Sequence, residues 1–534
     1  MKLIKSKIAQ AIGAVLTATV ASQAFAIDAS TYVEDANQVT LNISGATATR
    51  PGLLKLFQLN NANNGICADN TLDLYQSLDG LNYLMMCTGR TGGSPALPAS
   101  LQGKRIAVLK SDAGGSGNGV GPLTKGILHV PFWDLRNLGP GFLAGCAGVT
   151  TAPVSSSFSA YVLHTGCTNG STNATGIAPD AGISDLEPAI FKAVFTPALT
   201  NGDLAAIPGN PISAVIFGIP VSLNVRDNMQ RILFQPNTNV CNPDNPVAAT
   251  YLANAETAAC QPSLTKSQLA ALYTQNYPDW TFLSTATGSV ASPDAVPAHQ
   301  LGSSAEVFIC RRTATSGTQA VFETQLLNQR CVAGVPTFVT AAFDATHVNE
   351  ASGSGGVVSC LKANNTAGLG AIGVLSMEFP TTNTHVAATD SGYRYVKIND
   401  MSPCLLPTVQ SKYDFLGEST MQWRVIATTA GAALSANPSA LALATAVRDR
   451  IGAPAVVNDL NTAFTHSFCA TQGSGALLGN ALTNGASAAV PPFTAGDGTA
   501  NDVVLHPVLP KTRGINGPNS CGALIDIVPT TQLN

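Results

Sequence analysis

The stretch "FICRRTATSGTQAVFETQLL", from Phe308 to Leu327, holds a short apolar run, two arginines and a Thr-Ser-Gly-Thr turn in direct succession. The apolar run predicts a strand, and the apolar spacing in residues 318–329 predicts a helix. A strand that ends in Arg312 and a helix that begins with hydroxyl residues bring a guanidinium beside free backbone amides. Such a junction suits the binding of an oxyanion without a metal.

The same alternation of strand and helix patterns recurs along the chain. Helical spacing is found again in "LTKSQLAALYTQ" (264–275). Further apolar runs predict strands: "VTLNIS" (39–44), "KRIAVL" (104–109), "AVIFGIPVSLNV" (214–225), "AEVFIC" (305–310) and "GAIGVLSME" (370–378). We therefore expect an α/β fold with mixed sheets. The Gly/Ser/Asn/Pro-rich stretches 166–182 and 471–498 are expected to be loop insertions.

The composition limits the classes of ligand. Only 11% of the 534 residues are charged, and the formal net charge is −4. Without a basic tract, nothing favours nucleic acid or an anionic membrane as a partner. Any bound anion must therefore be held by local geometry.

The N-terminus has the pattern of an export signal. Three lysines precede the apolar stretch Ile8–Val20, and Ala24-Phe25-Ala26 offers small residues for cleavage. We expect residues 1–26 to be a signal peptide and the mature chain to be periplasmic or secreted. No later segment has the length and hydrophobicity of a membrane span.

Twelve cysteines follow this segment, an even number that predicts disulfides in an exported chain. The spacing leaves the connectivity open, but pairing of neighbours is the expectation. It gives four short loops, Cys67–Cys87, Cys146–Cys167, Cys241–Cys260 and Cys310–Cys331, and two longer ones, Cys360–Cys404 and Cys469–Cys521. No pair has C-x-x-C spacing and the seven histidines are scattered, so we expect no metal and no cofactor.

Four loops of the kind that bind oxyanions occur along the chain. They are "ISGATATRPGLLKLF" with residues 44–49, "DAGGSGNGVGPLTKG" with Ser116, "APDAGISDLEPAIF" with Ser184 and Asp185, and the opening stretch with Arg312. Each follows or precedes a predicted regular element and is rich in Gly, Ser or Thr. The further Gly-Ser-Gly triplets at Ser354 and Ser474 are attributed to composition.

In their order, these loops resemble the periplasmic phosphate-binding proteins of ABC importers, which have the two-lobed type II solute-binding fold. The resemblance is carried by "GAT" at 45–47, "GSGxGV" at 115–120, "DAGISDLEP" at 180–188, "RxxxSGT" at 312–318, and two later segments, "LTKSQLAALYTQNYPDW" and "GSGGVVSCL" followed by "GLGAIGVLSMEF". It implies two lobes with mixed sheets, helices on both faces and disulfide-bonded insertions. The implied parts are a first lobe from 27–212, a second lobe from 213–375, and a return to the first lobe with a C-terminal extension from 376–534.

The resemblance also implies a set of ligand-binding residues. They are Thr47, Ala48, Ser116, Asp185, Arg312, Ser316, Gly317 and Thr318. Asp185 is the informative member, because a carboxylate repels a bound anion unless the ligand carries a proton to donate to it. Hydrogen phosphate carries such a proton and sulfate does not, so the implied ligand is inorganic phosphate or a related protonated oxyanion.

The sequence departs from the family pattern beside the arginine. Ala314 stands where the family has an acidic residue that holds the arginine, so another group must orient Arg312. Arg50 follows the first turn closely, and Arg311 is expected to face solvent.

Each motif also has a structural interpretation. "RTATSGT" could be an ordinary helix cap, Asp185 a surface cap, and Ser116 part of a flexible loop. The Gly115–Gly119 run lacks dinucleotide-binding spacing, and Asn118 breaks the G-x-S-x-G pattern of hydrolases. The tryptophans are expected in the core or at lobe edges.

The leading hypothesis is an exported binding protein, not an enzyme, that sequesters phosphate or a similar protonated oxyanion between two lobes. An ABC importer permease is a candidate partner. Neutral insertions and many cysteines also fit an extracellular structural or adhesive matrix protein on the same fold. A secreted phosphatase is the third possibility, and it lacks an evident metal cluster or activated nucleophile.

Overall fold

A computed structural model describes residues 36–63, 65–93, 95–128, 130–135, 145–154, 158–168, 176–276, 279–283, 306–331, 344–384, 389–480, 508–509, 511–513 and 518–526. The expected signal segment 1–26 lies outside these residues. Contacts divide the chain into two compact units, the first made of Met1–Thr40, Phe57–Val108 and Trp133–Ser171, and the second of Leu41–Leu56, Leu109–Phe132 and Thr172–Asn534. These limits differ from the lobe boundaries expected from the sequence, which remain a prediction.

Four strands of the first unit pair with one another in parallel and antiparallel directions. Strand β2 (Leu72–Ser77) pairs antiparallel with β3 (Asn82–Thr88) and parallel with β6 (Tyr161–Cys167). Strand β5 (Gly148–Ala152) pairs antiparallel with β6. The inner strands β2 and β3 are almost wholly buried, whereas β5 is largely exposed, as expected for the edge of a sheet.

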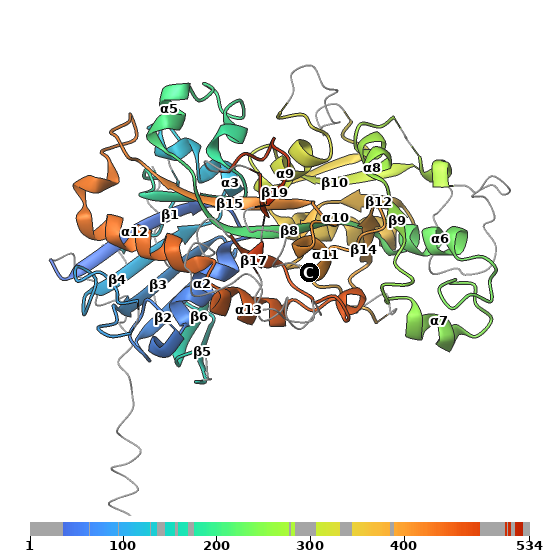
Figure 1. The fold of residues 1–534 in the computed structure, drawn as a ribbon, viewed down its shortest axis with the longest axis horizontal. Helices are drawn as coiled ribbons and strands as arrows, with labels where there is room; N and C mark the ends of the chain where they lie inside the picture. Colours follow the sequence, from blue (N-terminus) through green and yellow to red (C-terminus); the bar gives the residue numbers. More distant parts are fainter. Residues whose placement is uncertain are drawn as a thin grey trace, which may run out of the picture. The chain divides into compact units, whose positions relative to one another are not determined.

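The second unit is organised around the long strand β8 (Asn210–Ser222). Its first half pairs antiparallel with β15 (Leu416–Trp423) and with β16 (Leu477–Asn480). Strand β15 also pairs antiparallel with β7 (Ala181–Ser184), and β7 pairs parallel with β1 (Gln38–Gly45). Figure 1 shows β8 and β15 running side by side. Almost every residue of β8 and β15 is buried, which explains the continuous apolar run of β8.

The second half of β8 belongs to another group of strands. Three strands pair antiparallel with this half: β12 (Gly370–Gly373), β13 (Leu375–Ser376) and β14 (Tyr393–Ile398). Strand β10 (Val307–Arg312) pairs parallel with β12, and β11 (Val348–Ala351) pairs parallel with β10. Strand β10, the strand of the opening stretch, therefore lies between two parallel neighbours. Parallel strands end at the same edge of a sheet, so the loops after β10, β11 and β12 leave it together.

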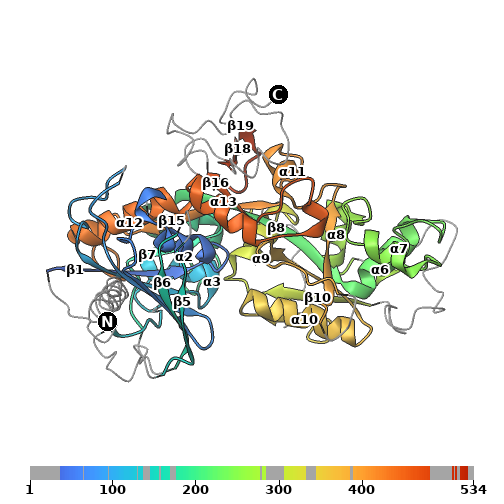
Figure 2. The same cartoon turned by 90° about the horizontal axis from the view of Figure 1, so that it is seen from below.

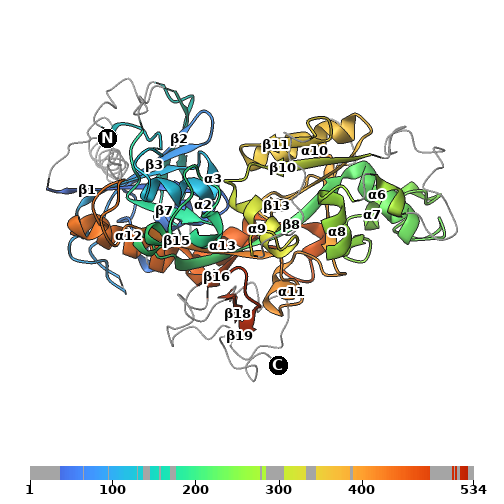
Figure 3. The same cartoon turned by 90° about the horizontal axis from the view of Figure 1, so that it is seen from above.

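Helices follow these strands directly. Helix α9 (Gly317–Gln325) follows β10, and α10 (Ser354–Thr366) follows β11 and packs on β10 and β12 (Figures 2 and 3). Helix α2 (Arg50–Gln58) follows β1, and the short helix α3 (Gly115–Asn118) follows β4 (Arg105–Ser111). The polar loops expected to bind an anion are thus the connections from strand ends to helix starts.

The remaining elements complete the description. They are η2 (Asn61–Asn63), η3 (Gly121–Leu123), η5 (Pro188–Phe191), α5 (Asn201–Ala206), α6 (Leu223–Leu233), α7 (Ala248–Asn254), β9 (Ser263–Leu264), α8 (Lys266–Tyr273), η6 (Trp280–Leu283), α11 (Leu405–Val409), η7 (Leu434–Ala436), α12 (Pro438–Ile451), α13 (Pro454–Ala463), η8 (Ser467–Cys469), β17 (Val508–Leu509), β18 (Lys511–Thr512) and β19 (Ile525–Asp526). None of the helices in the described ranges combines the length and the hydrophobicity needed to cross a membrane.

The α/β class with mixed sheets is confirmed, and the predicted strands and helices are present with shifted ends. The run 214–225 is a strand only to Ser222, where helix α6 takes over. A continuous apolar run does not mark where the period changes from strand to helix. The predicted loop 471–498 contains strand β16, a four-residue element too short to show periodicity. The three tryptophans are buried, as expected of core residues.

The structure contains six disulfides, and three of them are the predicted ones: Cys67–Cys87, Cys146–Cys167 and Cys241–Cys260. The other three predictions are wrong, because the structure joins Cys310 to Cys360, Cys331 to Cys521 and Cys404 to Cys469. Pairing of cysteines that are neighbours in the sequence fails where the packing of helices on the sheet determines which cysteines meet. Helix α10 covers β10 and brings Cys360 to Cys310, which leaves Cys331 for the C-terminal segment.

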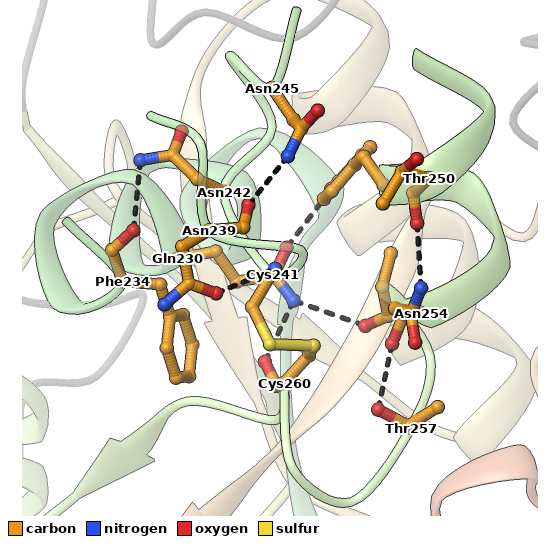
Figure 4. Close-up of a disulfide and its surroundings, with 12 residues drawn as sticks. Gln230, Phe234, Asn239, Cys241, Asn242, Asn245, Thr250, Asn254, Thr257 and Cys260 are labelled. Atoms are coloured by element: carbon orange, nitrogen blue, oxygen red, sulfur yellow. Dashed lines mark hydrogen bonds between the residues drawn. A yellow bond between two sulfur atoms is a disulfide. The ribbon is translucent and has the colours of Figure 1, made fainter. Parts of the chain in front are cut away.

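The short loop closed by Cys241–Cys260 shows how an insertion is held in place. Asn239 Oδ1 accepts from the backbone N of Cys241 at 2.9 Å, and Gln230 Nε2 donates to the carbonyl of Cys260 at 2.7 Å (Figure 4). Asn245 Nδ2 donates to the carbonyl of Asn239 at 2.9 Å. Side-chain amides thus form hydrogen bonds with backbone groups that no sheet pairing satisfies, which explains the Asn-rich composition of this loop.

Candidate functional site

Two of the predicted site residues are joined directly by hydrogen bonds. Ser116 lies in α3, and Asp185 comes directly after strand β7. Ser116 Oγ donates to Asp185 Oδ2 at 3.1 Å and accepts from the backbone N of Asp185 at 3.1 Å. The hydroxyl proton expected to face an anion is therefore directed at the carboxylate in this structure.

The loop before α9 packs against this pair. A Cβ at Gly317 would lie 2.1 Å from Ser116 Oγ and 2.2 Å from Asp185 Oδ2. The backbone N of Gly117 donates to the carbonyl of Thr315 at 2.7 Å. The start of α9, α3 and the loop after β7 therefore converge, and only a glycine fits at 317.

Arg312 reaches the same place from the end of β10. A Cβ at Gly115 would lie 3.6 Å from Arg312 Nη2. Arg312 is only 3% exposed, and its guanidinium donates to Ser354 Oγ at 2.7 Å and to the carbonyl of Ser352 at 2.8 Å. Burial lowers the pKa of Arg312 to about 10, so the group stays charged at neutral pH. Its Nε has no hydrogen-bond partner among the described residues.

Asp185 is buried and only partly satisfied. It is 2% exposed, and its Oδ1 accepts no hydrogen bond from any residue that the structure describes. Burial raises the pKa of Asp185 to about 6, although the hydrogen bond from Ser116 and the charges of Arg312 and Lys110 act in the opposite direction. The interpretation of Asp185 as a surface cap is therefore wrong.

The first turn, residues 45–47, is positioned by the packing of its flanking residues. Gly45 has φ of +111°, and a Cβ there would lie 2.0 Å from the carbonyl O of Ile183 and 2.7 Å from the Cα of Gly119. Thr47 is partly exposed, Ala48 is buried, and the carbonyl of Thr47 accepts from the backbone N of Arg50. The turn thus lies against α3 and β7, and the direct roles of Thr47 and Ala48 remain a prediction.

The three residues at the start of α9 have a structural role in the observed contacts. Ser316 is the N-cap, and its Oγ accepts from the backbone N of Gln319 at 3.4 Å. Gly317 and Thr318 are buried in the first turn of the helix. Capping and anion binding are compatible, since the first amides of a helix of this length remain available to a ligand.

A group of charged residues beside the turn was only partly recognised from the sequence; Lys110 and Asp112 are buried, and Arg50 is partly exposed. Lys110 Nζ donates to Asp112 Oδ1 at 2.5 Å and to the carbonyl of Gly45 at 2.9 Å, and Arg50 Nη1 lies 2.7 Å from Asp112 Oδ2. Burial lowers the pKa of Lys110, while the neighbouring carboxylate of Asp112 opposes that shift. Two charged residues at the end of an apolar strand and directly before a Gly-rich turn were the available signal.

Ser354 was missed for a different reason. Its Gly-Ser-Gly context was attributed to composition, yet its Oγ orients Arg312. A group other than residue 314 was expected to orient Arg312, and Ser354 is such a group. The signal was its position after a strand at the start of a predicted helix.

The expectation that Arg311 faces solvent is wrong. Its side chain is 2% exposed and lies 3.5 Å from Glu323 and 3.9 Å from Glu350. Strand β10 lies between β11 and β12 with helices packed on it, so residues on both of its faces are covered.

Across the described ranges, no three His, Cys, Asp or Glu side chains are grouped so that they could hold a metal ion. The polar groups that converge are instead two guanidinium groups, an ammonium group, two carboxyl groups, hydroxyls and the start of a helix. This set defines a buried polar cluster on an α/β scaffold, and its residues Arg50, Lys110, Asp112, Ser116, Asp185, Arg312, Gly317 and Ser354 are called the polar cluster below.

No protein-family model matches the chain, and no curated protein matches it in sequence. Among solved structures, it is similar to a phosphate-binding protein from Stenotrophomonas maltophilia, with 12% identity over 72% of this chain and 79% of that one, at a TM-score of 0.31. A putative phosphate ABC transporter substrate-binding protein with bound phosphate from Clostridium perfringens shares 13% identity over 54% and 79% of the chains, at 0.31. An ABC-type phosphate transport receptor from Vibrio cholerae shares 13% over 46% and 68%, at 0.25. At these values the similarities decide neither the ligand nor the function.

Proposed function

We propose that the chain is an exported solute-binding protein that binds phosphate or a similar protonated oxyanion in the polar cluster. One observation supports this above all. Arg312 Nε, a donor, and Asp185 Oδ1, an acceptor, are both buried without a hydrogen-bond partner among the described residues. Buried polar groups in native proteins are nearly always satisfied, so a donor and an acceptor left open in one cluster favour a missing ligand.

The chemistry of the two open groups limits the ligand. The guanidinium needs an acceptor oxygen, and a carboxylate needs a donor. A protonated oxyanion such as hydrogen phosphate or hydrogen arsenate offers both, whereas sulfate offers acceptors only. A donor or acceptor left unmatched in a buried site costs about 1–3 kcal/mol, or more for a charged group. The expected preference is therefore for phosphate and arsenate over sulfate.

The other predicted contacts complete the proposal. Gly317 and Thr318 contribute the first amides of α9, Ser316 a hydroxyl, and Thr47 and Ala48 the opposite side of the anion. Binding requires no covalent chemistry at any of these groups. The six disulfides fit an oxidising compartment, so we place the protein in the periplasm or outside the cell, with an ABC importer permease as its proposed partner.

Equilibrium dialysis with labelled phosphate tests the proposal. We expect saturable binding that arsenate displaces and equimolar sulfate does not. Arg312→Ala should abolish the binding, while Arg448→Ala, which removes a partly exposed arginine paired with Asp449, should leave it unchanged. If neither phosphate nor arsenate binds at millimolar concentration, the proposal is wrong and the structural matrix protein becomes the better hypothesis.

A further inference from the structure

A second buried acid, Glu378, interacts electrostatically with the polar cluster, and no role was predicted for it from the sequence. Glu378 follows β12 and β13, and β12 is the parallel neighbour of β10, whose last residue is Arg312. Strand β12 therefore ends at the same edge of the sheet as β10, and the chain continues along β8 as β13 before it reaches Glu378. Glu378 Oε2 is buried and has no hydrogen-bond partner within the described ranges.

The charged groups around Glu378 are those of the polar cluster. The positive charge of Arg50 stabilises its carboxylate, and the charges of Asp185 and Asp112 destabilise it. The charge of Glu378 in turn acts on Arg312 from β10 and on Tyr395 from β14. Glu378 thus shares one electrostatic environment with the proposed ligand site.

A count of charges shows why the second acid matters. The cations Arg50, Lys110 and Arg312 balance the carboxyl groups of Asp112, Asp185 and Glu378 if all are ionised. A bound phosphate dianion would then leave a net charge of −2 in a buried site, which is strongly unfavourable. A proton retained on Glu378 reduces this excess.

The surroundings of Asp185 and Glu378 give the two carboxyl groups different pKa values. Burial raises the pKa of Asp185 only to about 6, because Ser116, Arg312 and Lys110 favour its ionised form. Burial, together with the charges of Asp185 and Asp112, raises the pKa of Glu378 to about 8, although Arg50 and the side chain of Ser376 favour its ionised form. At neutral pH, Asp185 is mostly an acceptor and Glu378 mostly a protonated donor. Two acids whose surroundings separate their protonation states are suited to opposite roles.

We propose that Glu378 is a further ligand-binding residue, a protonated carboxyl group that donates a hydrogen bond from Oε2 to an oxygen of the bound oxyanion. The proposal rests on the proposed function and on three buried polar atoms without a hydrogen-bond partner among the described residues, Arg312 Nε, Asp185 Oδ1 and Glu378 Oε2. The charged groups that carry these atoms act electrostatically on one another. These three atoms then offer one acceptor and two donors to the ligand. It selects an oxyanion that carries at least one proton and has at least two unprotonated oxygens.

The consequence is a loss of affinity at high pH that Glu378→Gln removes. Glutamine keeps a neutral donor at the same position and cannot ionise. The labelled probe is inorganic phosphate, and its Kd is measured for the wild-type protein and for Glu378→Gln between pH 6.5 and 9.5. Because both proteins meet the same phosphate species at each pH, the ratio of the two Kd values cancels the ionisation of the ligand itself.

We expect the two Kd values to agree within about threefold at pH 6.5. At pH 9.5, 1.5 units above the pKa of about 8, the wild-type protein should bind about 30-fold more weakly than Glu378→Gln, because only the protonated form binds. Glu306→Gln, which changes a largely exposed acid just before β10, should follow the wild type at every pH.

A ratio that stays constant between pH 6.5 and 9.5 would overturn the role of Glu378 while leaving phosphate binding intact. Absence of phosphate binding at every pH would instead remove the proposed function. Infrared difference spectroscopy of the ligand-free proteins gives a second test. The wild-type minus Glu378→Gln spectrum at pH 7 should contain the carbonyl band of a protonated carboxyl group, and its absence would contradict the protonation state.

Discussion

Ser116 Oγ lies 3.1 Å from Asp185 Oδ2 and also 3.1 Å from the backbone N of Asp185. One hydroxyl therefore satisfies an acceptor and a donor of the same residue, in a place closed to water. This doubly bonded pair ties the short helix α3 to the end of strand β7. The hydroxyl proton is already engaged, so Ser116 acts on a ligand through Asp185 while the carboxyl group stays ionised.

Ser116→Ala should destabilise the protein by about 1–3 kcal/mol, because the backbone N–H of Asp185 would be left buried and unpaired. Phosphate affinity should fall as well, since the carboxyl group loses the hydrogen bond that fixes it. Urea denaturation and equilibrium dialysis measure the two effects. Ser474→Ala, at another Gly-Ser-Gly triplet, should lower stability without changing affinity, because its hydroxyl bonds to the backbone of His466.

Asp185 should make the stability of the ligand-free protein depend on pH with an unusual sign. Its pKa is raised from 3.8 to about 6, so the folded state binds the proton more tightly than the unfolded state does. This contribution to stability is complete below about pH 4 and is lost as the pH rises to about 6. The loss is on the order of 3 kcal/mol. Asp185→Asn should show no such loss, so the variant gains stability relative to the wild type across this window.

Asp203→Asn provides the opposite case for the same urea titrations. Despite partial burial, hydrogen bonds from Lys125 and Thr200 lower the pKa of Asp203. Its contribution to stability is present at neutral pH and is lost as the pH falls through the lowered pKa. The difference between Asp203→Asn and the wild type should therefore shrink on acidification. A stability gap for Asp185→Asn that is independent of pH would contradict the raised pKa.

Ser354→Ala should weaken phosphate binding through Arg312 without removing a direct ligand contact. The guanidinium would keep the carbonyl of Ser352 but lose the hydroxyl at 2.7 Å. A hydrogen bond to a charged group contributes about 1.5–3 kcal/mol, which corresponds to a loss of roughly 10- to 150-fold if all of it appears in the affinity. Ser354→Thr keeps a hydroxyl and should recover much of the loss in isothermal titration calorimetry. Equal losses for the two variants would exclude an orienting role.

How far the sequence predicted this arrangement depends on whether the interactions are local. The strand and helix around Arg312 follow from periodicity and turn chemistry within twenty residues, and the structure contains both. The convergence of Ser116, Asp185 and Gly317 was expected only through a resemblance, because no local pattern states which loops meet. Arg311 and Arg312 are adjacent and chemically alike, so the sequence does not distinguish a buried arginine from an exposed one. The structure shows that both are buried, because neighbouring elements cover both faces of β10.

The errors share the same physical origin. Ser354 lies 42 residues beyond Arg312 in the sequence and contacts it because β10 and β11 are parallel neighbours. Glu378 lies 66 residues beyond Arg312, and its charge acts on the guanidinium. The disulfides Cys310–Cys360 and Cys331–Cys521 likewise depend on which helix covers which strand. Spacing along the chain gave the correct cysteine pairs only where the bridge closes a short loop of about 20 residues.

The disulfide between Cys331 and Cys521 should support the site from outside. Cys331 follows α9, and next to Cys521 the backbone N of Ser520 donates to Glu187 Oε1 at 2.9 Å. Replacing both cysteines by serine opens a link between residues 190 apart and should cost about 2–4 kcal/mol of stability. Phosphate affinity should fall too, because Glu187 is only two residues from Asp185.

The matched control is the double serine variant of Cys67 and Cys87, a bridge within the other compact unit. It should lower the melting temperature without changing phosphate affinity. If the two double variants lose affinity equally, the C-terminal segment has no particular connection with the site.

Gly317→Ala is the most direct test of the convergence of the loops. The added Cβ would lie 2.1 Å from Ser116 Oγ, 2.2 Å from Asp185 Oδ2 and 2.7 Å from Asp185 Cβ, so at least one of these groups must move. Overpacking of this kind costs about 1–3 kcal/mol, and the displaced carboxyl group should abolish phosphate binding. Gly355→Ala makes the same substitution in the first turn of α10, where an added Cβ meets nothing within 4 Å. That control should bind phosphate normally and be more stable by about 0.5–1 kcal/mol, because alanine favours a helix over glycine. Normal binding by Gly317→Ala would mean that α9, α3 and the loop after β7 do not form one site.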